Sequence, residues 1–306
     1  MANSNPKKYI TPLVMNGLKG RMLEVPAKKP DQRRILLLYG HHASLERIFG
    51  LAEELNQYGT VTVPDFPGFG GMQSFYRIGM EPSLDNLADY LASFVKLHYK
   101  RSKFSIMGMS FGFVVATRML QRYPELTEKV DFMISIVGFA HKDDFKFKKR
   151  TYWTFRIASK IFSGRMLGWI GHNLFLRPTP IRLTYQILGR KNVKLLGFSK
   201  SKRKKLVDFE VKLWRSNELR TYAHTTGSMM NLDLCGTQVH LPVFHISVEP
   251  DRYFNNQLVE QHMRVIFTDF HGLTTTLSGH APTVVASAKD AAPFIPDKIR
   301  QLLASK

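Results

Sequence analysis

Short apolar runs alternate with amphipathic stretches along most of this chain. Residues 34–39 form an apolar run without polar alternation, typical of a strand buried on both faces of a parallel sheet, and residues 60–64 and 130–137 are expected to form further strands. Residues 45–58 and 84–98 place apolar side chains at helical spacing. Alternating strands and helices predict an α/β fold, a mostly parallel sheet with helices on both faces.

This alternation is interrupted once, between residues 141 and 231, where helical pieces mix basic and aromatic residues. We therefore expect a core formed by residues 1–140 and 232–306, with residues 141–231 inserted after the sixth strand as a helical cap. The other expected elements are strands at 9–15, 22–25, 103–107 and 243–248, extended pieces at 264–270 and 274–277, and helices at 113–120, 256–262 and 296–305.

The sequence Gly108-Met109-Ser110-Phe111-Gly112 lies between an expected strand and an expected helix. A serine flanked by glycines at such a junction is typical of a nucleophile elbow. The sharp turn needs unusual backbone angles and close packing, which glycine permits. The start of the following helix would favour negative charge that develops beside the serine.

Serine, acid and histidine follow in the order Ser110, Asp251, His280, each after an expected strand. With Y-G-H-H-A-S at 39–44, D-F-P-G-F-G at 65–70, V-E-P-D at 248–251 and G-H-A-P at 279–282, the chain resembles α/β-hydrolases that carry a cap. It departs from the usual motifs where Tyr39 replaces a histidine and Val248 replaces a glycine.

The resemblance implies a role for each motif. Ser110 would be the nucleophile, His280 the general base and Asp251 the residue that orients the imidazole. The backbone N–H groups of His41 and Phe111 would form the oxyanion hole. The residues expected to shape the pocket are Tyr39, Gly40, His42 and Met109.

The implied reaction is hydrolysis of a carboxylic ester through an acyl-serine. The many Phe, Leu and Met residues favour an apolar or lipid-like small-molecule substrate. A serine at the elbow argues against the dehalogenase and epoxide hydrolase branches, which use aspartate there. An acyltransferase, a C–C bond hydrolase and a non-catalytic binding protein on the same scaffold remain alternatives.

Other residues compete for the triad positions. His271 is an alternative base, and Glu249 or the pair Asp143 and Asp144 could supply the acid. Asp65 is expected to anchor its Pro-Gly loop instead of taking part in catalysis. No metal-ligand spacing is present, so we expect no metal and no cofactor. Histidines expected to be satisfied core or surface residues are His240, His245 and His262.

The net charge of +20 is concentrated in the expected cap, where 21 Lys and Arg face five Asp and Glu. Three interpretations stay open: a solvated cap, a cap that contacts an anionic membrane surface, and a cap that recognises an acidic substrate. Nucleic acid is not an expected partner, since no known module accompanies the charge. The aromatic and basic side chains that interleave in this segment include Tyr152, Trp153, Phe155, Trp169 and Phe175 with Lys149, Arg150, Arg156, Lys160 and Arg165.

The single cysteine, Cys235, excludes a disulfide framework within the chain. Residues 1–14 lack the apolar core of a secretory signal, and no apolar run reaches the length of a membrane span. These features predict a cytoplasmic protein, with peripheral membrane contact as an option. The sequence leaves the oligomeric state open.

Overall fold

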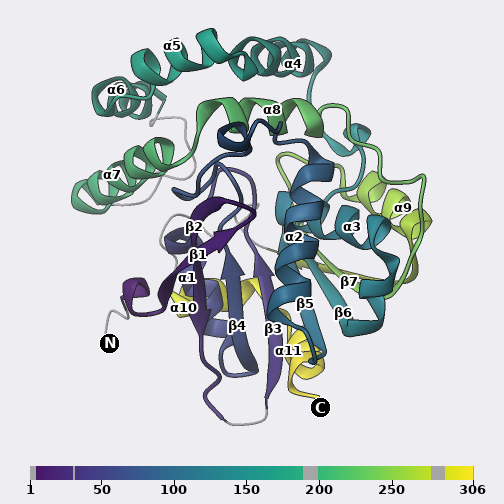
Figure 1. The fold of residues 1–306 in the computed structure, drawn as a ribbon. Coiled ribbons are helices and arrows are strands. Elements are labelled where there is room, and N and C mark those ends of the chain that lie inside the picture. The colour runs from purple at the N-terminus through teal and green to yellow at the C-terminus, as the bar shows by residue number, and fades with distance from the viewer. Residues whose placement is uncertain (1–4, 30–31, 189–198, 277–286, 306) are drawn as a thin grey trace.

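The computed structural model describes residues 5–29, 32–188, 199–276 and 287–305. Their strands form an eight-stranded sheet in the order β1-β2-β4-β3-β5-β6-β7-β8 (Figure 1). The first two strands are antiparallel, β2 pairs antiparallel with β4, and the pairs from β4 to β8 are parallel. The strands are β1 (Ile10–Met15), β2 (Leu18–Val25), β3 (Arg33–Leu38), β4 (Gly59–Pro64), β5 (Phe104–Met109), β6 (Val130–Ile136), β7 (Val239–Glu249) and β8 (Phe267–Thr276).

Helices cover both faces of this sheet, which confirms the expected fold class. In Figure 1, α2 and α3 lie in front of the strands, while α1 and α10 lie behind them. The core helices are α1 (Leu45–Leu55), α2 (Leu84–His98), α3 (Phe111–Arg122), α9 (Asn256–Ile266), α10 (Ala288–Ala291) and α11 (Asp297–Ala304). Short 3-10 helices are η1 (Pro6–Lys8), η2 (Phe75–Ile78), η3 (Pro124–Lys129), η4 (Lys142–Asp144) and η5 (Ala292–Phe294).

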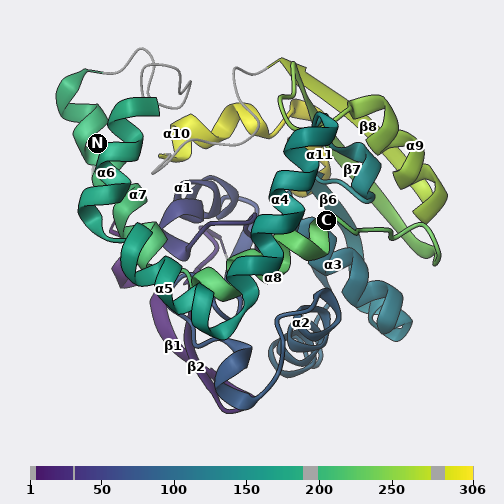
Figure 2. The same ribbon diagram turned by 90° about the horizontal axis from the view of Figure 1, so that it is seen from above.

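Five further helices follow β6 and precede β7. They are α4 (Lys149–Ser163), α5 (Arg165–Phe175), α6 (Pro178–Leu188), α7 (Lys200–Ser216) and α8 (Leu219–Met229). Figures 1 and 2 show α8 closest to the upper edge of the sheet, with α4 and α5 farther out. We refer to α4–α8 as the cap.

The chain enters and leaves the cap through a narrow stem. The Leu234 N–H donates to the Ala140 carbonyl at 3.1 Å, and the Lys142 N–H donates to the Leu232 carbonyl at 2.8 Å. His141 and Asp233 form an antiparallel bridge between the two segments. The two ends of the insertion are therefore held side by side, above the neighbouring strands β6 and β7.

Several expected boundaries were wrong. Strands β2 and β7 begin at Leu18 and Val239, each four residues earlier than expected, and α1 ends at Leu55, three residues earlier than expected. The short helix α10 was not expected. Residues 264–266, expected to start an extended piece, instead complete α9. The helix continues because Val259, Met263 and Ile266 extend its buried face at helical spacing. The two expected extended pieces are one strand, β8, over its described length.

Candidate active site

Ser110 occupies the sharp turn between β5 and α3. Its φ of 47° and ψ of −116° lie in a region that non-glycine residues rarely adopt. The Ser110 N–H donates to the Ile136 carbonyl of β6 at 2.9 Å, which fixes the turn against the neighbouring strand. The residue is only partly buried, whereas Phe111 and Met109 on either side are buried. The turn therefore presents a hydroxyl at the carboxyl edge of the sheet.

Glycines make this turn possible. A Cβ on Gly108 would lie 2.6 Å from the Phe113 Cα, and one on Gly112 would lie 2.5 Å from the Tyr39 carbonyl oxygen. Both clashes involve backbone, so no side-chain rotation could relieve them. A Cβ on Gly40 would lie 3.3 Å from the Ser110 Cβ, which places the loop after β3 directly against the serine.

His41 in that loop lies between the elbow and the cap. Its ring is 5.4 Å from the ring of Phe111 and stacks on Tyr222 of α8 at 4.3 Å. The His41 Nε2 is 2.8 Å from the Thr225 hydroxyl. Because that hydroxyl donates to the Thr221 carbonyl at 2.8 Å, His41 is the donor in the contact.

Burial and, to a smaller extent, the neighbouring His42 together lower the pKa of His41 to about 3. The imidazole is therefore neutral, and its Nε2 is already hydrogen-bonded to Thr225 of the cap. It is poorly suited to act as a base. Only the backbone N–H of His41 is suited to the expected oxyanion role.

His42 contacts the cap through α7. Its backbone has a positive φ of 55°, and its ring packs on Trp214 at 3.9 Å. The His42 Nε2 is 3.5 Å from Oε2 of Glu210, a carboxylate that is almost fully buried. Arg47 and the Tyr185 hydroxyl also reach this carboxylate, at 3.6 and 3.0 Å. The sequence did not identify Glu210 as a residue of this site. The only indication was that an acidic residue lies within a basic helix.

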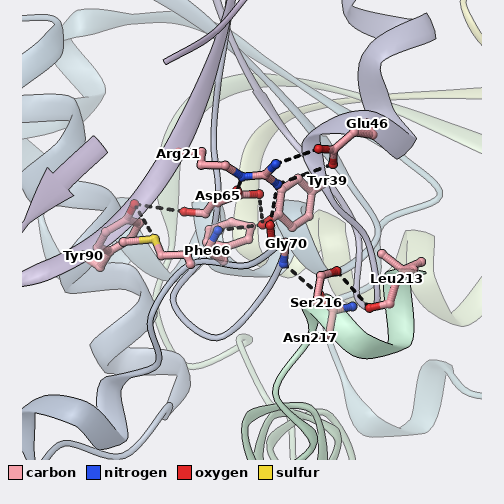
Figure 3. A network of polar contacts seen from close by, with 11 residues as sticks. Arg21, Tyr39, Glu46, Asp65, Phe66, Gly70, Tyr90, Leu213, Ser216 and Asn217 are labelled. Atoms are coloured by element: carbon pink, nitrogen blue, oxygen red, sulfur yellow. Dashed lines mark hydrogen bonds and ion pairs between the residues drawn. The ribbon is translucent and has the colours of Figure 1, made fainter. Parts of the chain in front are cut away.

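A polar network holds the loop that follows β4 (Figure 3). The Asp65 carboxylate accepts from Arg21 Nε at 3.0 Å and from the Tyr39 hydroxyl at 3.1 Å. The Phe66 N–H in turn donates to the Tyr39 hydroxyl oxygen at 2.7 Å. The prediction that Asp65 anchors its loop is confirmed. Tyr39, expected to shape the pocket, is buried beneath the loop and holds it in place.

Asn217, between α7 and α8, connects this loop to the cap. Its Oδ1 accepts from the Gly70 N–H at 2.8 Å, and its Nδ2 lies 3.2 Å from the His42 Nδ1 (Figure 3 shows the first contact). The side chain is 2% exposed. One cap residue therefore contacts both loops that border Ser110 and Asp65, a role that no sequence motif signalled.

Asp251 follows β7 and is 5% exposed. Its Oδ1 accepts from the N–H groups of Tyr253 and Phe254 at 2.7 and 3.0 Å, which fixes the carboxylate. Since β5, β6 and β7 are adjacent parallel strands, Ser110 and Asp251 follow strands about 10 Å apart at the same sheet edge.

The competing acids have other surroundings. Asp144 is fully buried, and its Oδ2 accepts from the N–H groups of Ala140 and His141 at 2.8 and 2.9 Å. Its Oδ1 lies 2.6 Å from Nδ1 of His262, so this carboxylate fastens η4 to α9. The side chains of Glu249 and Asp143 are exposed.

The competing histidine, His271, lies within β8, opposite Phe244 of β7. Its Nε2 is 2.8 Å from Asp269, and its ring stacks on Phe244 at 4.7 Å. It precedes Thr276, the last residue of β8, by five positions, which is about 16 Å along the strand. His280 lies outside the described residues.

The three histidines that were expected to be satisfied core or surface residues each have a partner. The Nδ1 of buried His245 is 2.9 Å from the Ser135 hydroxyl, and burial lowers the His245 pKa to about 4, against the opposing effect of Asp251. His262 binds Asp144, and exposed His240 lies near Thr268. Within the described ranges, no group of three or more His, Cys, Asp or Glu could hold a metal ion.

The family model for the alpha/beta hydrolase fold matches residues 33–271 of this chain. The chain belongs to this family. A comparison with curated protein sequences finds no match.

Solved structures of the same fold are numerous. A protein described as a lipase, from Acinetobacter baumannii AYE, aligns with a TM-score of 0.66 at 15% identity, over 96% of this chain and 92% of that one. A deformylase for N-formylmaleamic acid from Pseudomonas putida S16 gives 0.62 at 14%, over 89% and 94%. A thermophilic esterase from Thermogutta terrifontis gives 0.60 at 17%, over 96% of each chain. At these identities the likeness establishes the fold and leaves the substrate open.

Proposed function

We propose that this member of the alpha/beta hydrolase family is a serine hydrolase that cleaves a carboxylic ester. Ser110 attacks the ester carbonyl, His280 accepts the serine proton and returns it to the leaving group, and Asp251 orients the imidazole. The first half-reaction releases the alcohol and leaves an acyl-serine. Water then attacks the acyl-serine and releases the acid.

One observation carries this proposal: Ser110 has a positive φ at the start of α3. A non-glycine residue in this region costs on the order of 1–3 kcal/mol, and such strain persists where the surrounding structure enforces it. Backbone contacts at Gly108 and Gly112 enforce it here. A merely structural serine at a helix start would not need this geometry.

The neighbouring backbone supports an oxyanion site. Phe111 begins α3, and the first N–H groups of a helix lack intrahelical acceptors. The close approach of Gly40 to Ser110 supports a role for the His41 N–H, which follows Gly40 in the chain, as the second donor. Two such donors, together with the positive end of the helix dipole, would stabilise the tetrahedral intermediate.

Three supports favour this triad over its competitors. Asp251 is buried and fixed by two backbone donors, whereas Asp144 is already bound by His262 and two N–H groups. His271 lies within β8, paired with Asp269. His280 follows the last described residue of β8 by four positions.

The substrate that we propose is an ester with an apolar or lipid-like acyl group, and the location is cytoplasmic. An acyltransferase or a C–C bond hydrolase would use the same residues. Added alcohol acceptor separates transfer from hydrolysis, because transfer produces a new ester. A non-catalytic scaffold protein would leave Ser110 unlabelled by a fluorophosphonate.

The test is hydrolysis of p-nitrophenyl esters from acetate to palmitate by the full chain. Ser110→Ala should lower kcat by about 10³-fold or more, as should His280→Ala. Ser102→Ala, at the opposite end of β5, and His271→Ala are the matched controls and should retain activity. Activity that survives in Ser110→Ala, or that disappears in His271→Ala and not in His280→Ala, would contradict the assignment.

A further inference from the structure

The outer layer of the cap, helices α4–α6, exposes an unusual amount of apolar surface. Of the 18 large hydrophobic side chains exposed among the described residues, 12 lie between residues 149 and 188. Their exposed fractions range from 38% to 69%. Soluble monomers scatter such residues singly, and a concentration of them marks an interaction site. We call these 12 the apolar face: Trp153, Phe155, Ile157, Ile161, Met166, Leu167, Trp169, Ile170, Leu174, Phe175, Leu183 and Ile187.

Helical spacing shows that most of the exposed apolar side chains lie on one side of each helix. In α4, Trp153, Ile157 and Ile161 recur every fourth residue on the side away from buried Ser159. In α6, Leu183 and Ile187 lie opposite Ile181, which is buried. The outer sides of these helices are thus apolar, although the inner sides already make the contacts that hold the cap together.

In α5, two glycines determine which side faces outward. A Cβ on Gly168 would lie 2.4 Å from Cγ of Arg220, and one on Gly171 would lie 2.9 Å from a Leu219 methyl group. The glycine side of α5 is therefore pressed against α8. Met166 and Trp169 project from the opposite side and are 69% and 67% exposed.

The charge of this layer is one-sided. Residues 149–188 contain seven Lys and Arg and no Asp or Glu. On α4, Arg156 and Lys160 flank the exposed apolar positions, and the Arg156 guanidinium lies 5.4 Å from the Trp153 ring centroid. On α5, Arg165 joins Met166 and Trp169 around a shallow depression of about 350 Å³. Apolar side chains flanked by cations are typical of helices that lie in the headgroup region of a bilayer.

We propose that the apolar face docks on the surface of a membrane that contains anionic phospholipid. Trp and aliphatic side chains would enter the boundary between headgroups and acyl chains, while the Lys and Arg side chains contact lipid phosphates. The helices lie on the bilayer and do not cross it, and no helix in the described ranges is long and apolar enough to span one. Docking is a binding property and does not depend on the proposed chemistry of Ser110.

The same charge argues against a second copy as the occupant. In a two-fold symmetric dimer, each face would meet an identical face. Arg182 pairs with Asp208 of α7 at 2.9 Å, but the other six cations would then face six cations, with no acid in this segment to offset them. An anionic lipid surface satisfies both the apolar and the charged part of the face.

Flotation of the full chain with vesicles tests the inference. Vesicles of phosphatidylcholine alone are compared with vesicles of equal parts phosphatidylcholine and phosphatidylglycerol, at low and high salt. We expect binding to the anionic vesicles that weakens with salt. The double variant Met166→Gln/Trp169→Gln should bind at least about tenfold more weakly. Its control, Val14→Gln/Leu97→Gln, changes residues that are 66% and 60% exposed away from the cap and should bind like the wild type.

A second pair of variants tests the charge. Arg156→Gln/Lys160→Gln should weaken binding to anionic vesicles, whereas Lys100→Gln/Arg101→Gln, equal in charge but outside the cap, should not. Equal binding to both vesicle types, or no binding to either, would overturn the proposal. A dimer in light scattering that the Met166/Trp169 variant dissociates, with no vesicle binding, would replace the membrane with a second copy.

Discussion

Replacing Asn217 by leucine would test how the cap holds the loops beside the elbow. The change keeps a side chain of similar size but removes the acceptor for the Gly70 N–H and the group that faces His42. Because Asn217 is 2% exposed, water cannot readily take the place of the lost amide. The Gly70 N–H is then buried without that acceptor.

The expected cost follows from those two contacts. A hydrogen bond contributes about 1 kcal/mol, and a buried donor left without an acceptor costs about 1–3 kcal/mol more. We therefore expect local opening of the loop at residues 65–72 to become easier by about 2–4 kcal/mol. Since each 1.4 kcal/mol is a factor of ten, amide exchange at Gly70 should accelerate at least about 30-fold.

Hydrogen exchange followed by mass spectrometry, on peptides that contain Gly70, measures this directly. Asn217→Asp retains an oxygen in the place of Oδ1 and should preserve most of the protection. Asn231→Leu is the matched control, because Asn231 is exposed and its amide only donates to the Gly227 carbonyl at 2.8 Å. If Asn217→Leu leaves the exchange at Gly70 unchanged, the Asn217 amide does not hold this loop and the reasoning is wrong. The backbone hydrogen bonds from the Gly71 N–H to the Ser216 carbonyl and from the Glu218 N–H to the Gly68 carbonyl would then suffice.

Two other changes follow from the core. Gly112→Ala should destabilise the protein by about 1–3 kcal/mol or more in thermal melting, because the new Cβ meets the Tyr39 carbonyl oxygen at 2.5 Å. Gly236→Ala is the control: a Cβ at Gly236 has nothing within 4 Å, so this variant should melt like the wild type. His245, with its pKa lowered to about 4, is neutral when folded, whereas the unfolded chain protonates it below pH 6.5. The stability present above pH 6.5 is therefore lost as the pH falls towards 4, by about 2 kcal/mol at pH 5. His245→Gln should flatten this part of the pH profile of urea unfolding, and parallel profiles for both proteins would contradict the assigned pKa.

The sequence predicted the fold well, because a strand that is buried on both faces of the sheet is an uninterrupted run of apolar residues. Four consecutive residues of β3, Ile35 to Leu38, are fully buried, and their uninterrupted apolar run identified a central strand. The helix at 84–98 was predicted to the residue from the helical spacing of its apolar side chains, and in the structure the Ser83 side chain caps its first turn. At α9 the prediction ended too early, because the β-branched and aromatic residues Val265, Ile266 and Phe267 also suit a strand.

Contacts between the cap and the core could not be predicted. Helical spacing shows which side of a helix is apolar, but not which loop that side meets. Thr225 and Tyr222 are ordinary helix residues in the sequence, and only the folded chain places them against His41. Likewise, Tyr39 looked like a pocket residue because it replaces a motif histidine, and its hydroxyl turned out to support the loop after β4.

The stem at residues 140–142 and 232–234 allows the whole cap to be replaced as a unit. Its two ends leave the sheet side by side, joined by backbone hydrogen bonds that do not depend on side-chain identity. Closing a loop costs little more when the loop is longer, since the entropy grows only with the logarithm of its length. Evolution, or an engineer, can therefore replace everything between the two stem segments with a different set of helices and leave the strand register intact.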